Sequence, residues 1–323
     1  MAAAAMLAGC SRNEIVEQNP ENAISFDNSF VNNMTKATDV TLENLTDQTV
    51  YGVYKTGDNK MVYAFQAQKV AKDGTYSPIQ YWLKDAHYWF TAIAPNASAN
   101  WNFAPVVDET VANSRGVLSF NNETAQAEED LLMVAPAEIA CTSTKDMQKV
   151  ALDYGHQLSR VKFNFTNTYK TSAYQLRISD IHITNAISEA TMNIVDNASA
   201  WVAKEGTARF DIPFAIAADQ INVGKSVTSE HMYLIPNADN DGAEYNITFT
   251  IERMQYGESI ATYHHNVNVS FEKMEKGHSY VLSTEINEGN INPNPDPENP
   301  EDLPIEFTID VEDWMDWETP VLK

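Results

Sequence analysis

Residues 305–317 read IEFTIDVEDWMDW, and this stretch indicates the fold class of the whole chain. Every second residue in its first half is apolar: Ile305, Phe307, Ile309 and Val311. A period of two is what a β-strand needs to bury one face and expose the other. The twelve preceding residues, 293–304, include five prolines among Asn, Asp and Glu, which favours an extended, solvated arm. The sequence therefore predicts an amphipathic strand on a Pro-rich arm, which needs a groove in its own subunit or in another.

Short stretches with similar alternation recur along the chain and are separated by turn residues such as Asp73-Gly74. In the clearest of them, residues 161–165, three large apolar residues alternate with Lys162 and Asn164. Residues 128–135 fit either a further strand or a single helical turn. No amphipathic helix longer than two or three turns is evident. The other expected strands are residues 24–30, 50–54, 61–65, 88–93, 115–120, 176–183, 191–195, 210–214, 231–235, 245–251, 263–271 and 278–286.

These strands predict an all-β protein with two tandem β-sandwich domains. The chain of 323 residues is long enough for about two domains. We place the domain boundaries at 23–150 and 151–290, followed by a Pro-rich linker at 291–304 and the C-terminal strand region at 305–323. The net charge is −24, and such a surface repels nucleic-acid phosphates and anionic lipid. Nucleic acid is therefore not an expected partner.

The N-terminal residues 1–10 (MAAAAMLAGC) form an apolar run that ends in Leu-Ala-Gly-Cys. This ending resembles the bacterial lipobox, which predicts signal cleavage before Cys10 and attachment of a lipid to its sulfur. The alternative is an ordinary N-terminus with a free thiol, and no basic residue precedes the run. Residues 11–22 lack apolar periodicity and are expected to be a tether. If Cys10 is acylated, Cys141 has no disulfide partner and is expected to be a buried or unreactive thiol.

No arrangement of residues typical of an active site is found. None of the seven histidines belongs to an HExxH motif, and His264 and His265 are expected to point to opposite faces of one strand. No GxSxG motif is present, and the acidic residues are dispersed. We therefore expect neither an enzyme nor a bound metal or cofactor.

The chain carries similar amphipathic strands near its two ends. Ile24, Phe26 and Phe30 alternate with polar residues, much as the residues after Ile305 do. The polar stretch after Phe30 contains Lys36-Ala37, which a trypsin-like protease can cut if it is exposed. Either strand can in principle add to the same sheet edge by β-augmentation.

Several stretches together resemble the fimbrillin family of type V pili of Bacteroidota, in particular its Mfa-like branch. They are the ending at Cys10, Thr35-Lys36-Ala37, Tyr81-Trp82 and residues 88–95, 130–135, 156–163, 232–236, 276–280 and 305–317. The resemblance implies two transthyretin-like, Greek-key β-sandwich domains and export as a lipoprotein to the outer membrane and cell surface. It also implies that a trypsin-like protease removes the lipidated N-terminal strand, so that the C-terminal strand of another subunit fills the groove. The family commonly has Arg before the Ala of this loop, whereas this chain has Lys36.

The resulting expectation is a structural or accessory subunit of surface fimbriae that serves adhesion. Its partners would be other fimbrial subunits, held head to tail through a donor strand with Ile305, Phe307, Ile309 and Val311. The surface ligand is not predicted. The alternative is a surface glycan-binding lipoprotein of an outer-membrane saccharide importer, which would need exposed aromatic side chains as a stacking platform. The candidates for that platform are Tyr81, Trp82, Tyr88, Trp89 and Trp101.

Overall fold

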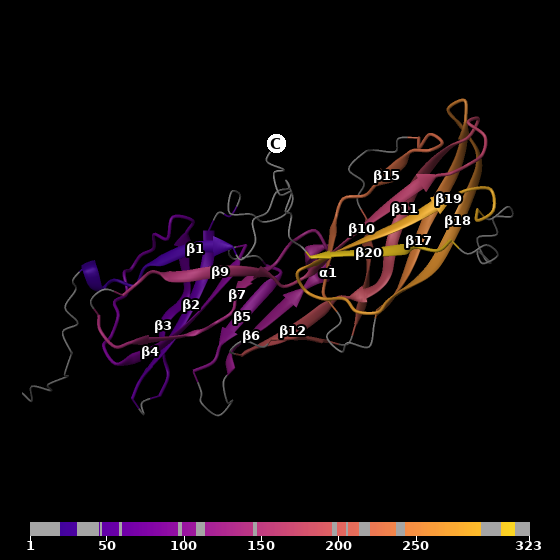
Figure 1. Cartoon of the computed structure of the whole chain (residues 1–323). Helices are drawn as coiled ribbons and strands as arrows, with labels where there is room; N and C mark the ends of the chain where they lie inside the picture. Colours follow the sequence, from indigo (N-terminus) through magenta and orange to yellow (C-terminus); the bar gives the residue numbers. More distant parts are fainter. Residues whose placement is uncertain are drawn as a thin grey trace, which may run out of the picture.

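The strands in the described part of the chain form four β-sheets that lie along one elongated molecule (Figure 1). The computed structural model describes residues 20–30, 45, 47–57, 60–95, 99–107, 114–144, 147–195, 199–204, 206–212, 220–236, 243–291 and 305–313. Within these residues the helical elements are the 3-10 turn Pro20–Asn22 and the short helix α1 (Asn122–Ala125). The predicted all-β class is confirmed, and the transthyretin-like topology stays a prediction.

The first sheet has seven strands, and its central strands are buried on both faces. Its order is β1-β9-β7-β4-β2-β3, with β8 also pairing with β4. Strands β2 and β4 are almost continuously buried, as expected for strands that are covered on both sides. The strand bounds are β1 Phe26–Phe30, β2 Asp47–Thr56, β3 Val62–Ala71, β4 Ala86–Ala94, β7 Leu132–Val134, β8 Glu138–Cys141 and β9 Val150–His156.

The second sheet combines strands from distant parts of the chain. Its order is β13-β12-β6-β5, with β5 at Trp101–Pro105, β6 at Ser114–Asn121, β12 at Glu189–Val195 and β13 at Trp201–Ala203. β12 runs antiparallel to β6, from Glu189 opposite Asn121 to Val195 opposite Ser114. The hairpin β12–β13 therefore belongs to the second half of the sequence but completes a sheet begun by the first half.

The third and fourth sheets pack against each other and enclose the largest core. One has the order β15-β10-β19-β20, with β16 also pairing with β10, and the other has the order β14-β11-β17-β18. The bounds are β10 Ser159–Asn167, β11 Gln175–Ile187, β14 Thr207–Asp211, β15 Ser226–Thr228, β16 Met232–Leu234, β17 Ala243–Gln255, β18 Glu258–Phe271, β19 His278–Ile286 and β20 Thr308–Asp313.

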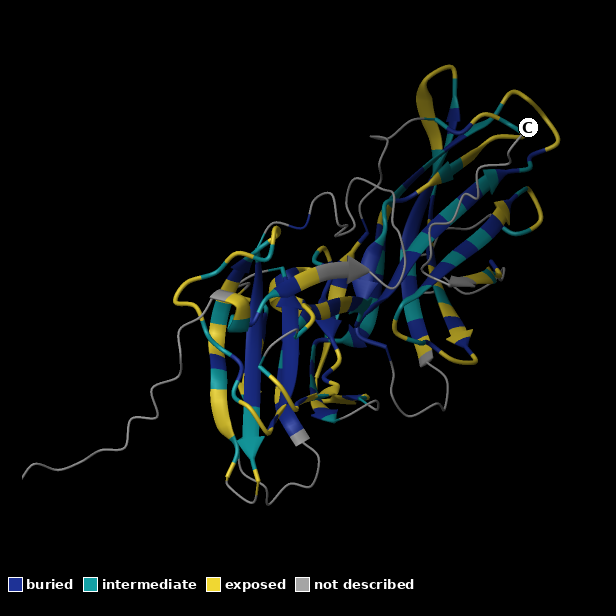
Figure 2. Cartoon of the chain, turned by 60° about the vertical axis from the view of Figure 1, so that its left-hand side comes forward, coloured by how far each residue is buried: buried dark blue, intermediate teal, exposed yellow. Residues whose placement is uncertain are grey.

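The alternation of polar and apolar residues decides which side of each sheet faces a core (Figure 2). In β10 the side chains of Val161, Phe163 and Phe165 are fully buried, as predicted from their period of two. β17 and β18 form a long hairpin whose turn residues, Tyr256 and Gly257, both have positive φ. Positive φ at two consecutive turn residues matches the right-handed twist of the flanking strands.

The sheets do not divide at the predicted boundary between residues 150 and 151. β9 begins at Val150 and lies in the first sheet, next to β1 and β7. The chain passes from this sheet to the third through Gln157 and Leu158, which separate β9 from β10. The assignment of two independent domains with those bounds remains a prediction.

Candidate functional site

The N-terminal segment lies at the edge of the first sheet. β1 is the outermost strand and pairs in parallel with β9, from Phe26 opposite Val150 to Phe30 opposite Tyr154. Ile24 and Phe26 are each only 2% exposed and belong to the core on that side of the sheet. The segment is thus an edge strand whose apolar side chains close a hydrophobic core.

The Phe26 ring fits between three other aromatic rings. Its centroid lies 5.5 Å from that of Phe65, 5.6 Å from that of Tyr76 and 5.8 Å from that of Phe90, all edge to face. Edge-to-face pairs contribute about 0.5–1.5 kcal/mol each beyond the burial of apolar area. This ring cluster, which we call the Phe26 cage, is therefore shaped for one aromatic side chain.

The C-terminal segment also occupies a sheet edge, here in the second half of the molecule. β20 pairs antiparallel with β19, from Thr308 opposite Ser283 to Asp313 opposite His278. Of the four predicted donor-strand residues, Ile305 is 1% exposed, and Phe307 and Ile309 are partly buried against the core. Val311 is 55% exposed. The predicted apolar face is therefore formed by the first three residues, and in this structure it is docked on its own chain.

Phe307 occupies a second cage of three aromatic rings. Its centroid lies 5.7 Å from that of Phe163, 5.8 Å from that of Phe165 and 6.0 Å from that of Phe249, again edge to face. Each of the two edge segments thus presents an Ile-x-Phe triplet whose phenylalanine is held by three rings.

Replacing Phe307 with Ala is expected to lower the free energy of unfolding by about 2–3 kcal/mol, because burial and ring contacts are lost together. Amide hydrogen exchange of residues 308–313 should accelerate, since β20 is a sheet edge. Val311→Ala is the matched control on the same strand and should change stability by less than about 0.5 kcal/mol, because Val311 is 55% exposed. Urea unfolding measures both variants, and equal effects would show that the Phe307 cage does not hold the strand.

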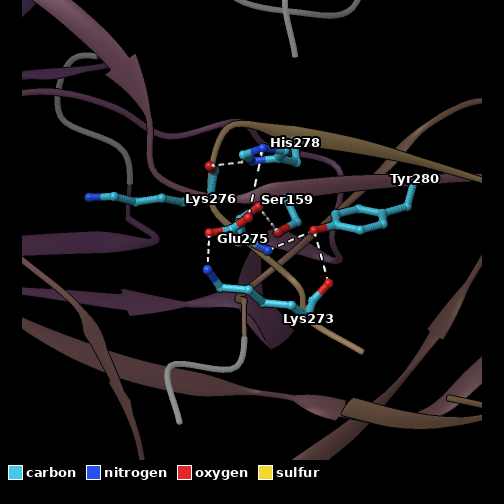
Figure 3. A network of polar contacts seen from close by, with 6 residues as sticks. All are labelled: Ser159, Lys273, Glu275, Lys276, His278 and Tyr280. Atoms are coloured by element: carbon cyan, nitrogen blue, oxygen red, sulfur yellow. Dashed lines mark hydrogen bonds and ion pairs between the residues drawn. The ribbon is translucent and has the colours of Figure 1, made fainter. Parts of the chain in front are cut away.

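The turn that leads into β19 is fixed by a polar network (Figure 3). The Tyr280 hydroxyl accepts from the Glu275 amide at 2.7 Å and donates to the Lys273 carbonyl at 3.2 Å. The Ser159 hydroxyl donates to the Glu275 carbonyl at 2.7 Å, and the Glu275 carboxylate also pairs with the Lys273 ammonium. His278, the first residue of β19, bonds through Nδ1 to the carbonyl of residue 276 at 3.1 Å. These bonds set the start of the strand on which β20 is docked.

A buried histidine lies behind the Phe307 cage. The His265 ring is 4% exposed and stacks on Phe249, with centroids 5.2 Å apart and an interplanar angle of 17°. Its Nε2 is buried without a hydrogen-bond partner. Burial, and secondly the neighbouring His264, lower the pKa of His265 from 6.5 to about 4. A neutral imidazole therefore packs against the cluster of rings that holds the C-terminal segment.

The sequence matches a model of the fimbrillin-like family over residues 35–314, which is most of the chain. The chain belongs to the fimbrillin-like family. The fold is similar to that of a fimbrial protein from Bacteroides vulgatus, with a TM-score of 0.62 at 12% identity, covering 91% of this chain and 99% of that one. A candidate cell adhesion protein from Parabacteroides distasonis has a TM-score of 0.53 at 12% identity, covering 93% of this chain and 97% of that one. No curated protein matches the sequence significantly.

Several predicted site residues of this fimbrillin-like chain lie outside the described residues. They are the lipidation candidate Cys10 and the processing candidates Lys36 and Ala37. The described Cys141 is buried and free, as predicted for a thiol without a disulfide partner. No helix in the described ranges is long and apolar enough to span a membrane.

The aromatic residues proposed as a glycan-stacking platform are mostly in the core. Trp82, Tyr88, Trp89 and Trp101 are all at most 9% exposed, and Tyr81 is half-buried. Trp82 and Tyr88 contact each other edge to face within the core that also contains Phe26. Side chains packed in this way cannot stack on a sugar, so this fimbrillin-like chain does not present the proposed platform.

One open cavity of about 300 Å³ lies at a β-bulge of β11, opposite β17 and β18. Asp180, in the bulge, has a φ of +51°. The cavity is also lined by His182 and His264, but His182 is already engaged by Asp211 and Arg209. Among the described residues no group of three or more His, Cys, Asp or Glu is arranged to hold a metal ion. The residues that line this cavity do not indicate which kind of ligand it would bind.

Proposed function

We propose that this protein is a structural or accessory subunit of cell-surface fimbriae and serves adhesion. In this proposal β1 leaves its sheet after proteolysis, and the C-terminal segment of another subunit takes its place beside β9. The observation that carries the proposal is the match between the two edge segments. Ile24-Ser25-Phe26 and Ile305-Glu306-Phe307 each place a buried isoleucine and a ring-caged phenylalanine at a sheet edge.

The energetics of β1 fit a strand that is stable until it is cut. Burial of Ile24 and Phe26 contributes about 1.5–3 kcal/mol each. While the chain is intact, β1 is tethered to its groove and is present at a high effective concentration. A cut at Lys36-Ala37 would remove that advantage, because β1 would then be bound only by non-covalent contacts. An incoming segment with a more continuous apolar face can then compete for the groove.

The incoming segment has such a face. In an alignment of the two Ile-x-Phe triplets, the polar residue Asn28 of β1 corresponds to Ile309 of the C-terminal segment. The parallel register places position 28 opposite Leu152, a fully buried residue of β9. The incoming strand would therefore place an apolar residue, Ile309, opposite Leu152, which favours its binding in the groove.

Before assembly, the donor segment is held on its own subunit, where β20 pairs with β19. In the free subunit the segment satisfies its main-chain hydrogen bonds on β19 and keeps Ile305 out of water. A subunit that donates its C-terminal segment to a neighbour still has its own groove beside β9, from which β1 has been removed. This groove can accept the C-terminal segment of a third subunit. Such a head-to-tail contact does not close on itself and builds filaments.

The predicted lipid on Cys10 lies on the N-terminal side of the proposed cut at Lys36. We propose that the precursor is anchored in the outer membrane through this lipid and that cleavage frees the rest of the subunit for assembly. Intact-mass measurement of the protein from its own cell surface distinguishes the two forms. A lipid on Cys10 marks the anchored form, and an N-terminus at Ala37 marks the processed one.

Low doses of trypsin should convert the purified protein into SDS-resistant ladders with an N-terminus at Ala37. Lys36→Gln is the control for the cut, and deletion of residues 305–313 is the control for the donor; both should abolish the ladder. Thermal unfolding must show that each variant is folded before digestion. A protein that is cut at Lys36 and remains monomeric would refute strand exchange, and ladders from the deletion variant would refute the role of the C-terminal segment.

A further inference from the structure

The segment that precedes β1 is held from two sides. On one side the Val150 amide of β9 donates to the Ser25 carbonyl at 2.7 Å. On the other side lies the loop that joins β3 to β4, residues 72–85. The Ile24 amide donates to the Gln80 carbonyl of this loop at 2.9 Å. Ile24 is thus bonded through its main chain to a loop that is not part of β9, the strand beside β1 in the sheet.

Tyr76 of this loop contacts both residues of the triplet that face the core. Its hydroxyl donates to the Ile24 carbonyl at 2.7 Å, while its ring is one wall of the Phe26 cage. The hydroxyl recognises a main-chain atom, which any residue offers, and the ring recognises an aromatic side chain two positions later. Tyr76 therefore binds best to a strand in which an aromatic residue follows two positions after the carbonyl that accepts its hydrogen bond.

The loop comes so close to the segment that residue 74 of the loop has no room for a side chain. A Cβ placed on Gly74 would lie 2.7 Å from the Phe26 carbonyl oxygen, and Gly74 has a φ of +82°. The turn is held by Asp73, whose carboxylate accepts from the Thr75 amide at 2.9 Å. The turn around Gly74 is thus fixed by hydrogen bonds within the loop, whereas Tyr76 and Gln80 bond to the segment itself.

We propose that the loop around Gly74, Tyr76 and Gln80 is the part of the groove that selects the incoming strand. We further propose that the strand it fits is the C-terminal segment of a second copy of this chain, with Ile305 at the position of Ile24 and Phe307 at that of Phe26. This inference rests on the proposed strand exchange and adds to it the selecting residues, the partner and the register.

The register follows from one main-chain donor. The position of Ile24 must supply an N–H to the Gln80 carbonyl, and Ile305 has one. A shift of one residue in one direction would bring Pro304, which has no N–H, to this position, and a shift of one residue in either direction would turn the apolar face outward. In the aligned register Ile309 and Val311 lie opposite Leu152 and Tyr154 of β9.

The main-chain N–H of Ile305 takes no part in the ladder between β20 and β19. That ladder begins at Thr308, three residues after Ile305. Removing the N–H of residue 305 therefore separates the two docking modes, because it affects the proposed exchange and leaves the β19 ladder intact.

Synthetic peptides of residues 301–313 with a fluorescent label test the proposal. The sequence contains no Lys or Arg, so trypsin does not cleave it. The full-length protein is digested at low trypsin dose in the presence of each peptide, and the label retained on the protein is measured after gel filtration. Undigested protein, in which β1 still fills the groove, is the control for peptide binding at other sheet edges. It should retain no fluorescent label.

The unmodified peptide and a Glu306→Gln peptide should be captured equally, because residue 306 lies on the solvent side of the strand. A peptide with N-methylated Ile305 and a Phe307→Ala peptide should each be captured at least tenfold less. The protein variant Tyr76→Phe should capture the unmodified peptide about fivefold less while still discriminating against Phe307→Ala, since its ring remains. Thermal unfolding before digestion must show that this variant is folded, with at most a small loss of stability from the missing bond to Ile24.

Equal capture of all four peptides by digested protein would overturn the assignment of the selecting loop and leave strand exchange intact. Unchanged capture by Tyr76→Phe would overturn the role of its hydroxyl. Failure of digested protein to capture even the unmodified peptide would overturn this inference and the proposed function together.

Discussion

A chain that ends at residue 157 is expected not to fold, although it contains every strand of the first sheet. The second sheet would then lack β12 and β13, which supply half of its strands. The core between the two sheets would lose Met192, Ile194 and Trp201, all at most 2% exposed. At about 1.5–3 kcal/mol each, these side chains contribute roughly 5–9 kcal/mol. That is comparable with the whole stability of a typical domain.

Urea unfolding followed by tryptophan fluorescence measures this result. The truncated chain should show no cooperative transition, and the full chain should show one. Fusing residues 187–204 to residue 157 through a flexible Gly/Ser linker should restore the transition, because the hairpin can pair again with β6. A truncated chain whose unfolding free energy lies within about 1 kcal/mol of the full chain would contradict the role of the hairpin.

Acid is expected to destabilise the second half of the molecule through His265. The pKa of this side chain is about 4 in the folded protein, below its ordinary value of 6.5, because its ring is buried. Between these pH values the unfolded chain binds a proton that the folded chain does not. The stabilisation from neutral His265 is therefore complete above pH 6.5 and is lost as the pH falls towards 4. The full loss is about 3 kcal/mol, from 1.36 kcal/mol for each pKa unit.

The variant His265→Phe isolates this contribution, since a phenyl ring can stack on Phe249 without titrating. Between pH 6.5 and pH 4 the parent protein should lose about 3 kcal/mol more unfolding free energy than the variant. The carboxyl groups titrate in both proteins and cancel in the difference. His264→Gln should keep most of the loss, because burial is the larger cause of the lowered pKa of His265 and the exposed His264 the smaller one. Parallel pH profiles for the parent and His265→Phe would contradict the prediction.

Strands with a clear alternation could be predicted from the sequence. β10 is such a strand, because three fully buried apolar residues alternate with half-buried polar ones. β5 and β13 were missed, because each is only three to five residues long and contains one or two buried aromatic residues. Alternation cannot be recognised over so few positions.

The pairing of distant strands was not predictable in the same way. β6 and β12 are separated by the whole of β7–β11, and nothing local in either sequence specifies the other as its partner. The two candidate edge segments were predicted as strands from the alternation of apolar and polar residues. Their locations were not, since an Ile-x-Phe strand satisfies the groove beside β9 and the edge of β19 equally well by pattern alone. The surrounding rings and the main-chain partners of the isoleucine, which only the folded structure shows, distinguish the two places.

The two-residue connection between β9 and β10 determines how a fibre built by this exchange would carry tension. A pull on the strand seated beside β9 would reach β10 at its first residue, Ser159. The opposing force would act at the C-terminal end of β19, which leads to the arm that carries the donor strand. β10 and β19 run parallel, from Arg160 opposite Ser279 to Asn167 opposite Ile286. Force applied to the start of one and the end of the other loads this whole ladder in shear, so its hydrogen bonds resist together and do not open one by one.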